Sequence, residues 1–212
     1  DIPIFSSTWH HRPEWEGYLD VWGIGHDGRV EVETMKELSR QGDRLRYTTD
    51  GQMCTDTPYS AVERLLPHYC FHYGVEAYEF WGVSWLKYNP YEYGWHSYIH
   101  QSGEPGESFY VRYPNGDGFL AYPGKHVDHP RPVPSVRLAQ VREGVEDYEY
   151  LHLLKQLAEE KDSAEARDAL KKASNLVEIP NAGGRYSSKI LPDPEGVLEV
   201  KKAVAEAIER LQ

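Results

Sequence analysis

The sequence predicts an α/β protein in which short parallel strands alternate with helices. Short apolar and aromatic runs, typical of strands, alternate with stretches of helical periodicity. In addition, 18 of the 27 aromatic residues lie between Tyr59 and Tyr122, ahead of a C-terminal region rich in Ala, Glu, Lys and Leu. Four or five strands are visible, whereas an eight-stranded barrel usually takes about 250 residues. If these strands belong to such a barrel, the 212 residues hold the C-terminal half of a (β/α)8 TIM-type barrel followed by C-terminal helices.

Each predicted strand is a short apolar or aromatic run bounded by turn-forming residues. Gly23 and Gly25 follow the second run, and Pro123 and Gly124 end the last one. The predicted strands are residues 2–5, 18–22, 44–48, 75–85 and 119–122. Proline and glycine interrupt residues 88–115, which we expect to form a long loop region.

The predicted helices are defined by apolar spacing and by residues that begin or end helices. Ser60 is suited to an N-cap, Pro67 predicts a kink, and Gly74 predicts a stop. The predicted helices are residues 32–41, 60–73, 135–161, 164–176 and 195–211. We therefore expect residues 1–160 to form the half-barrel and residues 161–212 to form a helical extension packed on it.

Composition argues against several classes of function. The chain has 23 Lys and Arg against 34 Asp and Glu, and its net charge of −11 repels nucleic acid and anionic membranes. No apolar run approaches the roughly 18 residues of a membrane span, and residues 1–9 lack the features of a signal peptide. Two cysteines, Cys54 and Cys70, are too few for a disulfide scaffold and leave pairing and compartment open. We expect no nucleic-acid partner and no membrane span.

A specific motif lies between Tyr122 and Leu154. It begins with Tyr-Pro-Gly-Lys and continues to Arg-Glu-Gly-Val-Glu-Asp-Tyr-Glu-Tyr-Leu. This segment resembles the C-terminal end of the catalytic domain of glycoside hydrolase family 123. Residues 73–85, with Ala-Tyr-Glu-Phe-Trp-Gly-Val-Ser-Trp, are similar to a strand of that family with a Trp near its end. Residues 18–22 and 44–49 fit the preceding strands more loosely, so the resemblance spans roughly residues 1–160.

The resemblance implies a (β/α)8 barrel, usually behind an N-terminal β-sandwich, that removes β-linked N-acetylgalactosamine from glycans or glycolipids. The implied mechanism is substrate-assisted: the 2-acetamido oxygen of the sugar attacks the anomeric carbon, one carboxylate orients the amide, and an adjacent acid protonates the leaving oxygen. It requires no cofactor, and extracellular or periplasmic action is the corresponding expectation.

The catalytic carboxylates of that family are a neighbouring Asp-Glu pair in the first half of the barrel. This sequence contains no Asp-Glu dipeptide, and Glu146-Asp147 has the reverse order within the motif helix. No catalytic residue is therefore assigned, and the pair is expected upstream of Asp1. The missing N-terminal half of the barrel, in cis or as a second polypeptide, is the expected partner.

Candidate substrate-binding residues lie near the predicted carboxyl ends of strands, where barrel active sites form. Trp81 and Trp85 offer indole faces to a sugar, and Glu79 offers a carboxylate to its hydroxyls. Alternation places these three on one face if the strand persists. An aromatic core or interface is the alternative, or for Glu79 a structural pair. The remaining candidates, each also compatible with packing, are Trp22, Tyr47 and Tyr122.

The motif helix has a structural interpretation. Glu143 and Asp147 are like charges four residues apart, so they need other partners, such as Arg137 or backbone donors. We expect this cluster to anchor the helix against the barrel and Gly144 to permit close approach. The histidines, including His126 and His129, do not form a convincing metal motif, so we expect no metal site.

Three hypotheses remain open. The chain is part of a glycoside hydrolase, a catalytically silent carbohydrate-binding relative, or a half-barrel that completes itself by dimerisation. The first predicts that the other half lies upstream in the same gene, and the third predicts a stable dimer. Unpaired strand edges would make the isolated half prone to aggregation.

Overall fold

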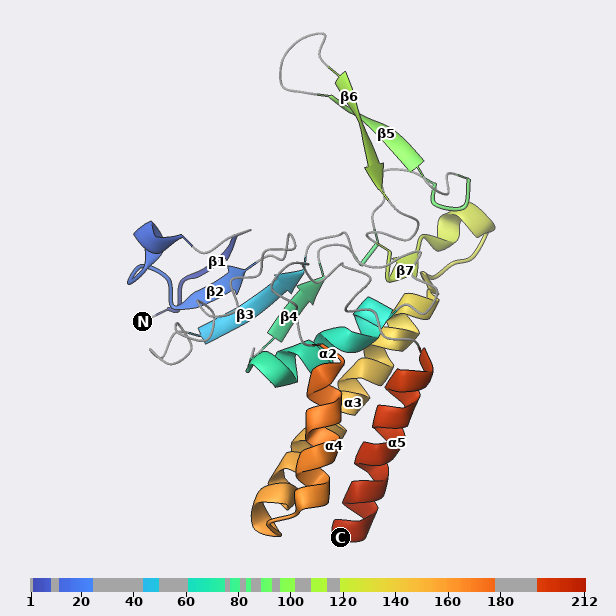
Figure 1. Ribbon diagram of the computed structural model, residues 1–212. Coiled ribbons are helices and arrows are strands. Elements are labelled where there is room, and N and C mark those ends of the chain that lie inside the picture. Colours follow the sequence, from blue (N-terminus) through green and yellow to red (C-terminus); the bar gives the residue numbers. More distant parts are fainter. Residues whose placement is uncertain are drawn as a thin grey trace.

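The computed structural model describes most of the chain. The described residues are 2–8, 12–24, 44–49, 61–74, 77–80, 83–84, 89–92, 96–101, 108–113, 119–177 and 194–212. They form a mixed α/β structure in which a sheet lies beside a group of long helices (Figure 1). This confirms the α/β class. The helix predicted at 32–41 lies outside the described residues, and the division at residue 160 stays a prediction.

A four-stranded parallel sheet overlaps the first four predicted strands, although its first two strands begin three residues later than predicted. Its strands are β1 (Phe5–Thr8), β2 (Val21–Ile24), β3 (Arg44–Thr49) and β4 (Ala77–Phe80), and they pair in chain order. Trp22 lies in register with Ser6 and Leu45. Parallel neighbours need a crossover connection, and the helix α2 (Ala61–Tyr73) lies between β3 and β4 in the chain, as the alternation predicts.

The long predicted loop contains regular structure. The strands β5 (His96–Gln101) and β6 (Ser108–Tyr113) form an antiparallel hairpin that projects away from the helices in Figure 1. The prediction of a loop throughout residues 88–115 was therefore wrong. Proline and glycine mark its turns, but His96–Gln101 and Ser108–Tyr113 are runs without either residue and can pair.

The segment after β4 pairs with the last predicted strand. In the predicted strand 75–85, parallel pairing ends at Phe80. Further along, the Val83 carbonyl accepts a hydrogen bond of 2.9 Å from the Ala121 amide, and Ser84 forms a β-bridge with Phe119. The strand β7 (Ala121–Tyr122) then pairs with β8 (Val133–Pro134). Two short 3-10 helices of the described chain lie in connections between strands: η1 (Pro13–Trp15) between β1 and β2, and η2 (Gly124–Val127) between β7 and β8.

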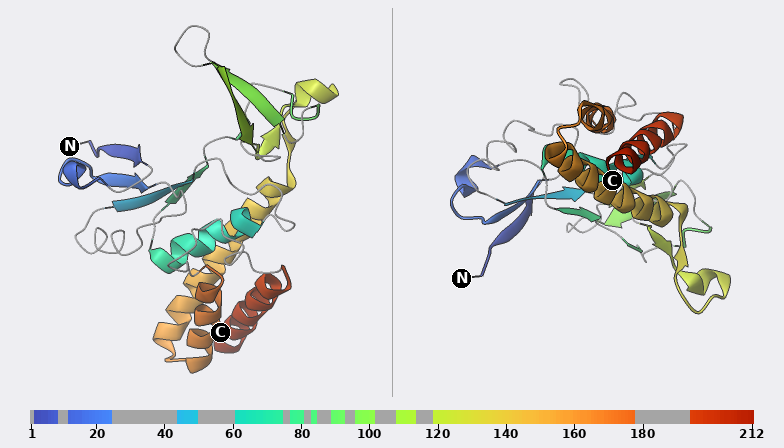
Figure 2. Two further views of the ribbon diagram at one scale, coloured as in Figure 1. Left: turned by 45° about the horizontal axis from the view of Figure 1, so that its top comes forward. Right: turned by 90° about the horizontal axis from the view of Figure 1, so that it is seen from below.

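Three long helices follow β8. They are α3 (Val136–Glu160), α4 (Ala164–Asn175) and α5 (Pro194–Leu211), close to the predicted boundaries. The Ser135 hydroxyl accepts from the Leu138 amide and the Ser163 hydroxyl from the Ala166 amide, so both N-termini are capped. Figure 2 shows the three helices side by side. Their shared core contains Leu151, Leu154, Ala158, Ala166, Ala169, Ala173, Val200, Val204, Ala207 and Ile208. None of the helices in the described part of the chain is long and apolar enough to span a membrane.

Gly144 lets α3 approach α2 closely, as predicted. A Cβ atom built at this position would collide with the Arg64 carbonyl oxygen and would lie 3.1 Å from Pro67 Cγ. The obstacle is largely helix backbone, so it cannot be relieved by rotating a side chain. Packing of α2 on α3 therefore depends on a residue without a side chain.

We expect Gly144→Ala to lower the free energy of unfolding by about 1–3 kcal/mol, because the methyl group forces the helices apart. The greater helix propensity of Ala offsets part of this loss. Chemical denaturation of the complete protein checks the effect. Gln156→Ala, at an exposed position of the same helix, is the control and should change stability by less than about 0.5 kcal/mol. Equal stability of both variants would contradict a close α2–α3 contact.

Candidate functional site

The carboxyl ends of β1–β4 form the edge at which the sequence places its candidates. Trp81 and Trp85 lie outside the described residues, and for Tyr47 and Glu79 the structure describes only the backbone. Tyr47 is in register with Ile24 and Tyr78, and Glu79 is in register with Thr48. In the sequence, Trp81 directly follows Phe80, the last residue of β4.

Trp22 is fully buried in the sheet. Its ring stacks on Trp15 at a centroid distance of 6.4 Å and an interplanar angle of 28°. This position favours packing over direct stacking on a sugar, because an enclosed ring cannot offer its face to a ligand.

Tyr122 lies in an aromatic group beside the same carboxyl edge, because its strand β7 is tied to Val83 and Ser84 just past β4. Its ring stacks on buried Phe119 at 5.6 Å and meets the exposed ring of Tyr91 at 5.4 Å. Tyr122 is itself half-buried. The structure describes the side chains of two of the six candidates, Trp22 and Tyr122. Of these two, Tyr122 is the one that is partly accessible to solvent.

Arg137 holds the Tyr122 hydroxyl. The Arg137 Nη2 donates a hydrogen bond of 2.6 Å to the tyrosine oxygen, and its Nε donates to the Phe119 carbonyl at 2.8 Å. The guanidinium carbon also lies 5.2 Å from the centre of the Tyr122 ring. Sequence reasoning treated Arg137 only as a partner for acidic residues and did not connect it with Tyr122. One signal in the sequence could have pointed to its role. Arg137 lies two residues after the N-cap Ser135, in the first turn of the helix, where the helix dipole makes a cation unfavourable.

A partly buried ionic cluster joins α3 to α2 and α5. We call it the Asp147 cluster; it contains the buried residues Arg64, His68 and Asp147 and the partly exposed Glu143 and Lys201. Arg64 Nε donates to Asp147 Oδ2 at 2.7 Å, and His68 Nε2 lies 3.2 Å from the same oxygen. Lys201 Nζ lies 3.1 Å from Asp147 Oδ1 and 3.2 Å from Glu143 Oε2. The like charges of Glu143 and Asp147 are thus offset by cations from two other helices.

The cluster corrects the expected partner of these carboxylates. Arg137 was proposed from sequence, but it contacts Tyr122 and Phe119, whereas Arg64, His68 and Lys201 surround Asp147. Arg137 lies ten residues before Asp147, nearly three helical turns away. Local spacing could not reveal partners that are distant in the chain.

The electrostatics of the cluster favour ionised carboxylates. Burial by itself would raise the pKa of Asp147, but hydrogen bonds from His68 and Arg64, with the charge of Arg64, outweigh it and lower the pKa from 3.8 to about 2. A hydrogen bond from Lys201 and its charge lower the pKa of Glu143. Asp147 is therefore an anion at neutral pH and is unsuited to act as a general acid.

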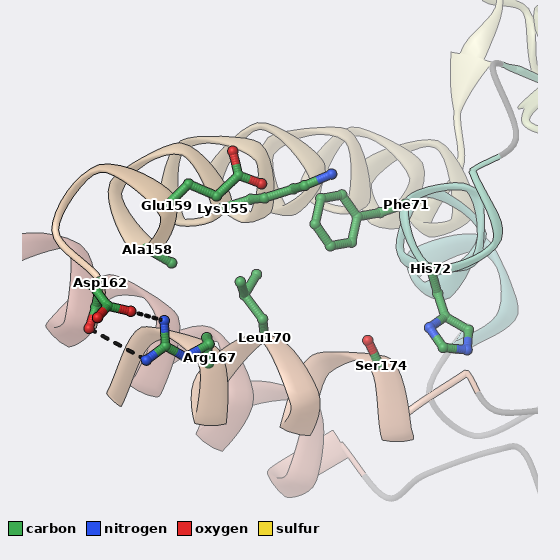
Figure 3. Close-up of a pocket in the computed structure, with 9 residues that line it drawn as sticks. All are labelled: Phe71, His72, Lys155, Ala158, Glu159, Asp162, Arg167, Leu170 and Ser174. Atoms are coloured by element: carbon green, nitrogen blue, oxygen red, sulfur yellow. Dashed lines mark hydrogen bonds and ion pairs between the residues drawn. The ribbon is translucent and has the colours of Figure 1, made fainter. Parts of the chain in front are cut away.

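A pocket of about 540 Å³ lies elsewhere, between α2, α3 and α4 (Figure 3). Phe71 and His72 line it from the last turn of α2, which precedes the amino end of β4. It therefore lies toward the amino ends of the strands, opposite to the edge where barrel enzymes bind substrates. Lys155, Glu159 and the exposed pair Asp162–Arg167 complete its polar rim.

Within the described ranges no group of three His, Cys, Asp or Glu side chains could hold a metal ion. His129, one of the two histidines considered, instead places its Nδ1 2.8 Å from the Arg131 carbonyl oxygen. Cys70 is buried in α2, and Cys54 lies outside the described residues.

We expect Asp147→Asn to lower the free energy of unfolding by about 3 kcal/mol, because it leaves buried cations without their anion. The folded-state pKa of Asp147 lies below its unfolded value, so its stabilisation is complete above about pH 4 and is lost as the pH falls towards 2. Denaturation measured from pH 2 to pH 7 checks both. Glu146→Gln, at an exposed carboxylate that contacts Arg142 at 3.8 Å, is the matched control. A parallel pH profile for wild type and Asp147→Asn would contradict this role.

Comparison with known proteins gives a match in sequence and in fold. Residues 57–154 match the model of the glycoside hydrolase 123 catalytic domain. No curated protein sequence matches the chain significantly. Among solved structures, the chain is similar to a family 123 glycoside hydrolase from Clostridium perfringens, described in connection with glycolipid glycan hydrolysis, with 14% identity and a TM-score of 0.55. The similarity covers 99% of this chain and 36% of that enzyme, so this chain spans about a third of its length.

The sequence match includes α2, β4, β7 and most of α3, and therefore Tyr122, Arg137 and the members of the Asp147 cluster other than Lys201, which lies in α5. The structural match extends over the remaining elements. The chain thus resembles the glycoside hydrolase family 123 catalytic domain in its sequence over residues 57–154 and in its fold over nearly its whole length.

Proposed function

We propose that this chain is the C-terminal half of a (β/α)8 barrel in a glycoside hydrolase that cleaves β-linked N-acetylhexosamine, N-acetylgalactosamine foremost, from glycans or glycolipids. The catalytic-domain match over residues 57–154 is the observation that carries the proposal. The catalytic Asp-Glu pair would be supplied by a segment upstream of Asp1, and the reaction would be the substrate-assisted one, with retention at the anomeric carbon.

The sheet supports the barrel. Four strands that are all parallel and pair strictly in chain order are the arrangement from which (β/α)8 barrels are built. Their carboxyl ends lie on one edge, and Trp81 follows one of them directly. In a complete barrel this edge would face the scissile bond, with Trp81, Trp85, Glu79, Tyr47 and Tyr122 as substrate contacts; buried Trp22 would support them from within the sheet.

The outer edge of β1 supports an upstream partner. β1 ends the strand order, so one side of its backbone has no neighbour in the described sheet. Ile2 is 90% exposed and Ile4 is 56% exposed just before β1, and Phe5, its first residue, is 44% exposed. Exposed apolar residues on an open strand edge are an aggregation hazard unless another element covers them. The preceding strand of the barrel is the occupant that fits this edge.

The complete protein tests this proposal. We expect it to hydrolyse a chromogenic β-N-acetylgalactosaminide, and replacing the upstream Asp-Glu pair by Asn-Gln to lower kcat/KM at least about a thousandfold, or about 4 kcal/mol. The denatured mass of the product of the full-length gene should exceed 24.4 kDa. A single product of 24.4 kDa that forms a stable dimer would instead support the self-completing half-barrel.

We expect Trp81→Ala in the complete protein to reduce kcat/KM or sugar affinity at least about tenfold, about 1.4 kcal/mol, because the indole would no longer stack on the sugar. Steady-state kinetics and calorimetric binding check this. Tyr18→Ala is the control, since this aromatic residue is 75% exposed and precedes the amino end of β2. Unchanged kinetics in Trp81→Ala would leave Trp81 only a packing role.

A further inference from the structure

Arg137 is placed where a structural arginine is unfavourable. It is 6% exposed, it occupies the first turn of α3 where the helix dipole is positive, and that turn contains no acidic residue. Its contacts are the Phe119 carbonyl, the Tyr122 hydroxyl and the Tyr122 ring. In the described part of the chain, no carboxylate forms an ion pair with it. Buried charges are normally paired, so this arrangement points to a role beyond stability.

The contacts of Arg137 fix the direction of the Tyr122 hydroxyl. The guanidinium can only donate, so the tyrosine oxygen accepts its 2.6 Å bond. The hydroxyl hydrogen must then point to a different partner. A hydrogen bond from a charged donor also polarises the tyrosine O–H, which makes it a stronger donor to the next acceptor.

Tyr91 lies beside this donor. Its ring centre is 5.4 Å from that of Tyr122, at an angle of 45°, and Tyr91 is 43% exposed. Tyr122 lies beside the segment that follows β4, because Ala121 donates to the Val83 carbonyl and Phe119 bridges to Ser84, and the ring contact brings Tyr91 to the same place. A flat exposed ring next to an oriented hydroxyl matches the needs of a pyranose, which presents an apolar C–H face and acceptor oxygens around its rim.

We propose that Arg137 is a positioning residue that aims the Tyr122 hydroxyl at an oxygen of a sugar bound against Tyr91. The proposal rests on the proposed glycosidase function and specifies one sugar contact of that same site. Arg137 itself does not touch the sugar; it acts through Tyr122. Phe119 supports the arrangement in two ways: its ring stacks on the Tyr122 ring, and its carbonyl oxygen accepts a hydrogen bond from Arg137 Nε.

The test uses steady-state kinetics of the complete protein with a chromogenic β-N-acetylgalactosaminide. Tyr122→Phe removes only the hydroxyl and should raise KM about tenfold with kcat within about twofold, because this bond contributes to binding in ground and transition states alike. Tyr150→Phe is the matched control, since Tyr150 is an exposed tyrosine of α3, with its ring near Lys201. It should leave KM unchanged.

A double-mutant cycle separates positioning from structural support. Arg137→Met should raise KM about as much as Tyr122→Phe, and Arg137→Met in the Tyr122→Phe background should add no further increase, because both changes remove one oriented donor. Arg137→Lys, which keeps a donor, should recover part of the loss. If Arg137→Met multiplies KM equally in both backgrounds, or Tyr122→Phe leaves KM unchanged, the proposal is overturned.

The design also distinguishes this proposal from the proposed function. If the wild type cleaves the substrate and Tyr122→Phe has the same KM, only the role of the Arg137–Tyr122 pair is rejected. If the wild type shows no turnover, calorimetric titration with N-acetylgalactosamine replaces KM by Kd for the same variants, with the same expected ratios. A wild type that neither cleaves nor binds this sugar rejects both proposals.

Discussion

The ionic contacts of Asp147 hold the helical part of this protein in place. One carboxylate on α3 contacts Arg64 and His68 of α2 and Lys201 of α5. Since α2 lies between β3 and β4 in the chain and packs on both α3 and β4, the same contacts connect α3 to the parallel sheet through α2. Gly144, one turn before Asp147, allows the approach that brings these side chains within hydrogen-bonding distance. Burial of the charges is tolerated because each carboxylate meets more than one cation.

The helix α3 therefore connects the core to the candidate site. Its middle is fixed by the Asp147 cluster, while its first turn holds β7 through Ser135, which donates to the Leu120 carbonyl at 2.8 Å, and through Arg137. β7 in turn pairs with the segment beyond the carboxyl end of β4. The motif from Tyr122 to Leu154 thus combines two physical roles: its acidic part supports packing, and its N-terminal part places Tyr122 at the edge that we propose as the sugar site.

The two ends of the strands differ in what they offer a ligand. The carboxyl edge has an exposed tyrosine ring and an oriented hydroxyl, whereas a pocket of about 540 Å³, lined from α2, α3 and α4, lies towards the amino end of β4. In a parallel sheet with helical crossovers, variable loops at the carboxyl ends can change chemistry without disturbing the core. The proposed sugar contacts therefore lie at the carboxyl edge and not in the pocket at the other end of the strands.

The sequence by itself determined the α/β class, the four parallel strands, the helix α2 and the three C-terminal helices, because apolar periodicity and capping residues such as Ser135 and Ser163 act locally. It also indicated the resemblance to glycoside hydrolase family 123, through the motif that begins at Tyr122. The β5–β6 hairpin was missed because turn-forming residues dominate this polar, glycine-rich region, whereas the two strands form by pairing with each other. Only the tertiary structure decided that Asp147 pairs with Arg64 and that Arg137 binds Tyr122. These partners are 83 and 15 residues apart, and their contact depends on packing of α3 against α2 and β7, which no local pattern specifies.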